Sequence, residues 1–244
     1  MTRLVASEAL KVVTTRLLLW LGLLLVGLEL LVIALHVSHD SLESLGEARN
    51  QRDIVSITAA SALIALIAGI VLAAGEFAHG TIAPTFLVAP VRERVVAAKL
   101  LVGALAGAAL ALAAAAFAWA FAALLLSLRS VSLHLGSGAA LRVLFGTIAA
   151  AAIAGALGVG FGSIARRQTG AIVFAFVWLL VVEPLLAIAG IDRYAPGHAI
   201  ASVVEGGTQS SELLPFGAGL GLSLAYVVGF AVAGGLVVKG SDVS

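Results

Sequence analysis

The segment from Gly75 to Lys99 reads GEFAHGTIAPTFLVAPVRERVVAAK. It carries charged residues and two prolines, and it lies between two hydrophobic runs that hold no charge. Charged side chains are costly inside a bilayer, so a segment of this kind must leave the hydrocarbon. We therefore expect residues 75–99 to be a water-facing connection between two membrane spans, and the place where the chain meets a soluble partner.

The composition of the whole chain also indicates a membrane protein. Of its 244 residues 61% are hydrophobic and only 11% are charged, too few charges for the surface of a soluble domain. Each hydrophobic run is near or above the ~20 residues that cross a bilayer as a helix, and the runs lack the alternation of barrel strands. The sequence predicts one all-α integral membrane domain, residues 1–244, with six transmembrane helices at about 17–35, 54–74, 100–126, 143–165, 170–190 and 214–238.

Residues 2–15 are predicted to form a separate amphipathic helix. At about 100° per residue, Arg3, Glu8 and Lys11 share a polar face, and the opposite face is mostly apolar. This pattern is typical of a helix that lies in the membrane interface. A short solvated tail is the alternative. The run that follows lacks a convincing cleavage site, so we expect an uncleaved span and not a signal peptide.

The positive charges predict the orientation. With the N-terminus in the cytosol, nine Lys and Arg residues fall on the cytosolic side and five on the outer side. Cytosolic connections carry an excess of Lys and Arg, so both termini are expected in the cytosol. The third connection runs against this rule, because Arg129 and Arg142 flank it on the outer side.

The connection 75–99 contains the parts of a short helix. Gly80 permits a sharp turn, and Thr81 is a suitable N-cap that makes Ile82 the first helical residue. Pro84 is tolerated in the first turn of a helix, and Pro90 stops the helix.

The side chains of this helix are largely apolar and need a surface to cover them. Phe86 and Leu87 are the largest of them. The cover is either the lipid interface and the bundle, or a groove in a soluble partner. At the exit of the second span, Glu76 can stay hydrated or pair with a basic residue.

The order of residues in this connection resembles that of type-2 ABC transporter permeases: Gly75-Glu76-Phe77, then Gly80-Thr81-Ile82, then Pro90, Arg92 and Lys99. In that family the connection forms the coupling helix, which receives force from a separate ATPase subunit. The resemblance implies that the ATPase-coupling residues of this chain are Glu76, Phe77, Gly80, Thr81, Ile82, Pro84, Phe86, Leu87 and Pro90.

The resemblance also implies an assembly and a location. Two permeases, identical or paralogous, bind two ATPase subunits in the plasma (inner) membrane and export substrate between their bundles. The N-terminal helix becomes a cytosolic elbow helix, and the connection 192–212 holds short re-entrant helices, although a glycine-rich loop fits that connection too. ATP and Mg²⁺ belong to the partner, and no cofactor is expected on this chain. In agreement, the sequence holds no G-x-x-x-x-G-K-[ST] motif.

Two carboxylates fall inside predicted spans, Glu29 in the first and Glu183 in the fifth. An ionised acid in hydrocarbon costs at least about 3 kcal/mol, so each is expected to face the bundle interior or a wet cavity. Both are candidates for a translocation pathway. The structural alternative is a hydrated plug, with Glu183 beside a kink at Pro184.

Other chemistry is not indicated. The chain has no cysteine, no H-E-x-x-H motif and no acidic metal cluster, and its five histidines lie in connections or at span edges. We expect neither catalytic residues nor a metal site, and no nucleic-acid partner. An ATP-independent secondary transporter or channel is the alternative function, and a membrane anchor for a partner is a third.

Small residues recur on the predicted helices. Gly103 and Gly107, Gly158 and Gly162, and Gly217 and Gly221 are each four residues apart and so share a helical face. Such faces allow two helix backbones to approach closely in lipid. We expect ordinary packing within the bundle at all three pairs; a dimer contact is the alternative.

The orientation can be tested by cysteine labelling, since the chain contains no cysteine of its own. His79→Cys should react with an impermeant maleimide only from the cytosolic side, and Ser44→Cys only from the outer side. Labelling of both from one side would contradict the six-span topology.

Overall fold

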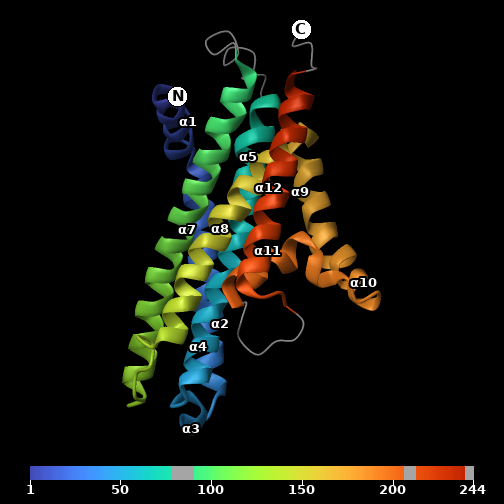
Figure 1. The fold of residues 1–244 in the computed structure, drawn as a ribbon. Helices are drawn as coiled ribbons and strands as arrows, with labels where there is room; N and C mark the ends of the chain where they lie inside the picture. Colours follow the sequence, from blue (N-terminus) through green and yellow to red (C-terminus); the bar gives the residue numbers. More distant parts are fainter. Residues whose placement is uncertain (79–90, 206–212, 240–244) are drawn as a thin grey trace.

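The computed structural model describes residues 1–78, 91–205 and 213–239. These residues form helices and connections without a strand (Figure 1). The helices are α1 (Thr2–Thr14), α2 (Arg16–His39), α3 (Leu42–Leu45), α4 (Ala48–Ser56), η1 (Ile57–Ala60), α5 (Ser61–Ala78), α7 (Arg92–Leu128), α8 (Gly138–Ala165), α9 (Gln168–Val177), η2 (Trp178–Val182), α10 (Glu183–Ile188), η3 (Asp192–Tyr194), α11 (Pro196–Glu205) and α12 (Phe216–Lys239).

Six helical stretches are long and apolar enough to cross a membrane: Leu18–His39, Ala48–Ala78, Arg92–Leu128, Gly138–Ala165, Gln168–Ile188 and Phe216–Lys239. The prediction of an all-helical protein with six such helices is confirmed. The chain is a multi-pass membrane protein.

Several helices extend beyond the hydrophobic runs. Helix α5 continues to Ala78 and α7 begins at Arg92, so helix occupies both ends of the segment 75–99. The polar residues that open α7 include Arg, Glu and Lys, which have good helix propensity and let a helix continue past the hydrocarbon. The predicted helix from Ile82 to about residue 89 lies outside the described residues.

The centre of the bundle is a tight contact of α5, α7 and α8. A Cβ atom added to Gly155 of α8 would lie 2.2 Å from the carbonyl oxygen of Gly103 on α7. One added to Gly69 of α5 would lie 2.1 Å from the carbonyl oxygen of Gly155. No side chain fits at these distances, so glycine is required for the three backbones to meet.

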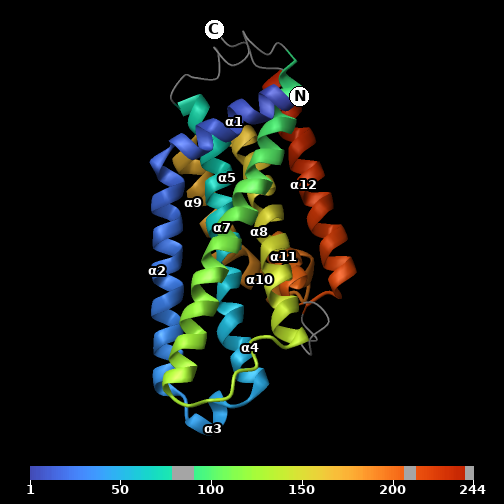
Figure 2. The ribbon, with the colours of Figure 1, turned by 90° about the vertical axis from the view of Figure 1, so that its left-hand side faces the viewer.

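The remaining helices surround this centre. Helix α2 packs against α7, α12 packs against α8, and α9 packs against α5 and α8. Helix α1 ends before Thr15, whose backbone is extended, and contacts α7 and α2. It lies across one end of the bundle, transverse to the long helices (Figure 2).

The fifth span is broken at its middle. A single π-helical stretch, Trp178–Val182, separates α9 from α10, and Pro184 stands in the first turn of α10. Proline has no N–H to donate and its ring crowds the preceding turn, which accounts for the irregular hydrogen bonding there. Beyond α10 the chain turns back through η3 into α11, which packs against α8 and α12. The described part of the connection 192–212 is therefore largely helical, and Gly206 and Gly207, which suggested a glycine-rich loop, lie outside the described residues.

The predicted glycine packing is confirmed for two pairs and wrong for the third. Gly103, Gly107, Gly158 and Gly162 all meet the backbone of a neighbouring helix. Added Cβ atoms on Gly217 and Gly221 would meet nothing within 4 Å. Helix α12 instead turns the face of Gly219, Ser223, Gly234 and Val238 towards the bundle.

The central contact predicts a strong difference between two glycine substitutions. Gly155→Ala should destabilise the protein by about 3 kcal/mol, because its methyl group would overlap the α7 backbone. Gly221→Ala, in an equally helical but open position, should be neutral or slightly stabilising. Thermal unfolding of the purified protein in detergent measures both. Equal midpoints for the two variants would contradict the close contact.

Candidate functional site

Four charged side chains meet at one end of the bundle: Glu8 and Lys11 of α1, Glu76 of α5 and Lys99 of α7. The Lys99 Nζ lies 2.6 Å from Glu8 Oε2 and 2.8 Å from Glu76 Oε1. The Lys11 Nζ lies 2.7 Å from Glu8 Oε1 and 2.7 Å from Glu76 Oε1. Each cation thus bridges both carboxylates. We call this group the charge cluster.

The charge cluster is buried and electrically balanced. The side chains of Glu8 and Lys99 are 0% and 3% exposed, and only Lys11 reaches the surface substantially. Two charges of each sign cancel, and this mutual pairing offsets the desolvation that buried ions suffer. Removal of any one member would leave an uncompensated charge inside the protein.

The pKa of Lys11 reflects the same arrangement. Burial alone would lower it, but the hydrogen bonds to Glu76 and Glu8 outweigh burial and raise the pKa above its ordinary value of 10.5. Lys11 therefore contributes its full stabilisation at neutral pH. That contribution is lost only as the pH rises through the raised pKa.

A second set of contacts closes the same end of the bundle. Arg166, at the C-terminus of α8, stacks over the ring of Phe77, with its Cζ 5.6 Å from the ring centroid. The same guanidinium donates to the carbonyl oxygen of Val237 on α12. Arg92, at the start of α7, donates to the carbonyl oxygen of Val238 at 2.8 Å. These arginines cap the last turn of α12, where backbone carbonyls lack helical partners.

Both sets of contacts adjoin residues 79–90. Glu76 and Phe77 stand just before this stretch, and Arg92 and Lys99 follow it. Through them the flanks of the stretch are joined to α1, α8 and α12 as well as to each other. The ends of five helices are thus mechanically linked to one connection.

The structure therefore places two of the predicted coupling residues, Glu76 and Phe77, in this end of the bundle. Of the two expectations for Glu76, pairing with a basic residue is the one observed. The other predicted coupling residues lie outside the described part of the chain: Gly80, Thr81, Ile82, Pro84, Phe86, Leu87 and Pro90.

Sequence reasoning missed the roles of Glu8, Lys11 and Lys99 as partners of Glu76. Glu8 and Lys11 are three residues apart and share the polar face of the N-terminal helix, which was a local signal for pairing. Nothing local indicated that Lys99, 91 positions from Glu8, completes the group.

Glu183, the acid predicted in the fifth span, has protein partners at both of its carboxylate oxygens. Its Oε1 accepts hydrogen bonds from the Trp178 indole at 2.9 Å and from the Gly197 backbone at 2.7 Å. Its Oε2 lies 3.0 Å from His198 Nδ1. The expectation that Glu183 faces the protein is confirmed, and His198 supplies the basic partner that the sequence did not reveal.

This carboxylate fixes α11 against the broken span. A Cβ atom on Gly197 would lie 2.4 Å from Glu183 Oε2, so glycine is needed for the approach. His198 also faces Asp192, with 3.4 Å between Nε2 and Oδ2. The result is a row of carboxylate, imidazole and carboxylate that joins α10, α11 and η3.

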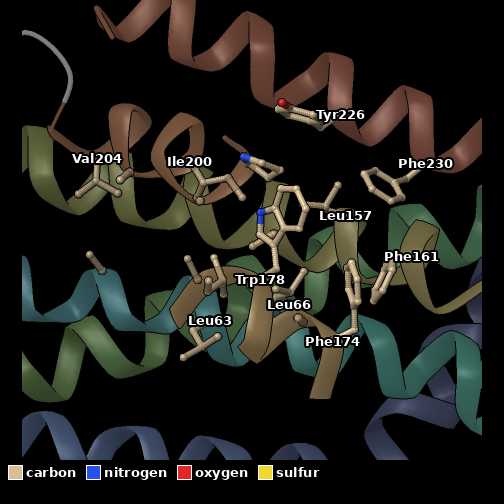
Figure 3. A pocket seen from close by; sticks show the side chains of 18 of the residues that line it. Leu63, Leu66, Leu157, Phe161, Phe174, Trp178, Ile200, Val204, Tyr226 and Phe230 are labelled. Carbon is tan, nitrogen blue, oxygen red and sulfur yellow. The ribbon is translucent and has the colours of Figure 1, made fainter. Parts of the chain in front are cut away.

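A pocket of about 500 Å³ adjoins Glu183 (Figure 3). It lies between α5, α8, the α9–η2 stretch, α11 and α12, and its walls are almost entirely apolar. Trp178 and Gly197, which both donate to Glu183, line it. The volume is typical of sites for small organic molecules.

Glu29 is buried separately. It is 1% exposed on α2, which packs against α7, and neither carboxylate oxygen has a hydrogen-bond partner among the described residues. The expectation that it faces the bundle interior is confirmed. The two intramembrane acids belong to different parts of the fold and do not form one site.

Within the described ranges, no group of three or more His, Asp or Glu side chains is arranged to hold a metal ion. No protein-family model matches the sequence, and no curated protein matches it.

The charge cluster predicts unequal costs for two lysine substitutions. Lys99→Met should destabilise the protein by about 3 kcal/mol, because it leaves two buried carboxylates with one cation. Lys239→Met removes an exposed pair with Glu93 and should cost less than about 0.5 kcal/mol. The double variant Glu8→Gln/Lys99→Met should recover part of the loss, since Lys11 and Glu76 remain balanced. Thermal unfolding in detergent measures all three, and similar midpoints for Lys99→Met and Lys239→Met would contradict the cluster.

Proposed function

We propose that this chain is the membrane-spanning permease subunit of an ATP-driven exporter of the type-2 ABC class. In this proposal a separate ATPase subunit hydrolyses ATP, and the stretch 79–90 receives the force. Two permeases, identical or paralogous, form the transport unit in the plasma (inner) membrane, with both termini in the cytosol.

The observation that carries this proposal is the linkage of one connection to five helix ends. Glu76 on one flank is bonded to Lys11 and Lys99, and Phe77 beside it stacks on Arg166. Arg92 on the other flank caps α12. A push on the stretch between them would move α1, α5, α7, α8 and α12 together. These flanking positions also carry the sequence resemblance.

The arrangement of the helices at this end of the bundle supports the same proposal. Figure 2 shows α1 at the end where α5 finishes, α7 begins and α12 finishes. An amphipathic α1 in the interface would act as an elbow helix, held to α5 and α7 by the charge cluster. It would then follow those two helices when they move. Such an attachment is expected in a subunit that is moved by force from a separate ATPase chain.

The two intramembrane acids take different roles in this scheme. Glu183 is bonded to Trp178, Gly197 and His198, so we assign it to positioning α11. Glu29 is buried without a hydrogen-bond partner among the described residues and remains the candidate for the translocation pathway. Only interactions that change during the transport cycle can drive transport. An acid without a fixed partner is free to change its interactions.

One observation favours the alternative, an ATP-independent transporter driven by protons. The row Glu183, His198 and Asp192 places a titratable imidazole between two carboxylates at the edge of a pocket. Such rows can relay protons. We rank it second, because it does not account for the linkage around residues 79–90.

Co-purification with an ATPase subunit of the type-2 ABC class tests the proposal. The wild-type permease should retain the ATPase, and Phe86→Asp or Leu87→Asp should reduce retention at least tenfold, because a charge is placed in an apolar contact. Leu133→Asp is the matched control. Leu133 is 52% exposed at the opposite end of the protein, and its replacement should leave retention unchanged.

The outcomes separate the two candidate functions. Wild-type retention by both Phe86→Asp and Leu87→Asp would remove this stretch as the docking site. Failure of any ATPase to bind the wild-type chain, together with uptake driven by a pH gradient in proteoliposomes, would establish the proton-driven alternative.

A further inference from the structure

The row of Glu183, His198 and Asp192 joins the broken fifth span to the rest of the bundle. Helix α10 packs against η2 and η3, its neighbours in the chain, whereas α11 packs against α8 and α12. Figure 1 shows α10 directed away from the long helices. The bonds that Glu183 makes to α11 therefore bridge two parts of the fold that share few other contacts.

The two ring nitrogens of His198 each face a carboxylate. Nδ1 lies 3.0 Å from Glu183 Oε2, and Nε2 lies 3.4 Å from Asp192 Oδ2. An ionised carboxylate only accepts hydrogen bonds, and a neutral imidazole carries one N–H and one lone pair. A neutral ring would therefore point its lone pair at one of the two carboxylates. The imidazolium has an N–H on both nitrogens and suits both partners.

Solvent protons can reach this ring. The side chain of His198 is 31% exposed, whereas that of Glu183 is only 3% exposed. Among the described residues, only Glu183 and Asp192 lie within ion-pair distance of the imidazole. The other titratable or charged side chains on α11 and on the elements packed against it are Arg142, Arg193, Tyr194, Glu205, Tyr226 and Lys239.

These further groups do not pair with the ring. The guanidinium of Arg193 stacks over Tyr194, with its Cζ 5.0 Å from the ring centroid. Tyr226 donates its hydroxyl to the carbonyl oxygen of Tyr194 at 2.7 Å. Arg142 is exposed, and Glu205 lies about two turns farther along α11. The two carboxylates of the row are thus the immediate ionic partners of the imidazole.

The row also lies between two walls of the pocket. Trp178 and Leu179 line the pocket from the broken span, and Pro196 and Gly197 line it from the start of α11. Movement of α10 away from α11 would separate these walls and widen the pocket.

From these observations we propose that the row is a pH-dependent latch on the pocket. While His198 is protonated, its ring holds α10 and η3 against α11 through Glu183 and Asp192. As the pH rises and the ring loses its proton, one carboxylate faces a lone pair, the contact weakens, and α10 moves away from α11. Histidine is the side chain that ordinarily changes charge between about pH 5 and 8. The latch belongs to this chain alone and does not depend on an ATPase partner.

Distances between spin labels test the latch, because the chain has no cysteine of its own and accepts labels at chosen positions. Ile188→Cys on α10 and Val228→Cys on α12 are both exposed and report the distance from the broken span to the bundle. Pulsed electron paramagnetic resonance of the protein in lipid nanodiscs should give a longer mean distance at about pH 9 than at about pH 5. A control pair, the exposed Phe145→Cys on α8 with Val228→Cys, does not span the row and should give one distance at both pH values.

Three substitutions in the labelled protein assign the response to the row. His198→Gln replaces the ring by a group that does not titrate, so the shift in distance should be lost. Asp192→Asn lets a neutral ring accept from the new amide while it donates to Glu183, so the short distance should persist at both pH values. His134→Gln, which removes an exposed histidine from the connection between α7 and α8, should leave the shift unchanged.

Four results would overturn the proposal. The first is a distance across the row that does not change with pH in the wild-type sequence. The second is a shift of wild-type size in His198→Gln, and the third is the same shift in Asp192→Asn, which decides the matter even where His198→Gln does not fold. The fourth is an equal shift in the control pair, which would show that pH alters the whole bundle and not the latch.

Discussion

The structure depends on the contact of three backbones at Gly155. In lipid there is no hydrophobic force between helices, so association relies on close packing and on hydrogen bonds. At Gly155 the helices α5, α7 and α8 approach until no Cβ atom fits between them. The contact fixes the positions of these three helices along the bundle axis relative to one another. It thereby brings Glu76 of α5 level with Lys99 of α7, so that one cation can reach two carboxylates.

The glycine contact at the centre of the bundle and the charge cluster at one end hold the helices by different kinds of interaction. The backbone contact at the centre sets how closely the helices approach, whereas ion pairs at 2.6–2.8 Å hold specific side chains together. Glu8 is the buried residue of α1, and with Lys11 it ties this helix to α5 and α7 through the charge cluster. A helix held in this way can move with α5 and α7 without being part of their core. That property is what the proposed coupling function requires.

The sequence predicted the broad fold well and the sites only in part. Hydrophobic runs of about 20 residues are a strong local signal, so the six spans and the helical class followed directly. The acids in the spans had to face protein, since the cost of a lipid-facing carboxylate does not depend on the details of the fold. Their partners were out of reach: Lys99 is 91 positions from Glu8, and only the helix contacts decide that they meet. For Gly217 and Gly221 the local signal was misleading. Their four-residue spacing is typical of helix packing, but α12 turns both glycines away from the bundle.

The break in the fifth span explains why an acid and an apolar pocket lie together. Pro184 cannot donate to the preceding turn, and the helix loosens into the π-helical stretch Trp178–Val182. A continuous helix would fill the space beside α12, but here the span diverges from α12 and α11 folds back into the gap (Figure 1). Glu183 then serves as the acceptor that ties α11 to the break, through the backbone of Gly197 and the ring of His198. The space that remains between α11, α12 and the broken span is the pocket, and the Glu183 carboxylate lies behind two of its lining residues, Trp178 and Gly197.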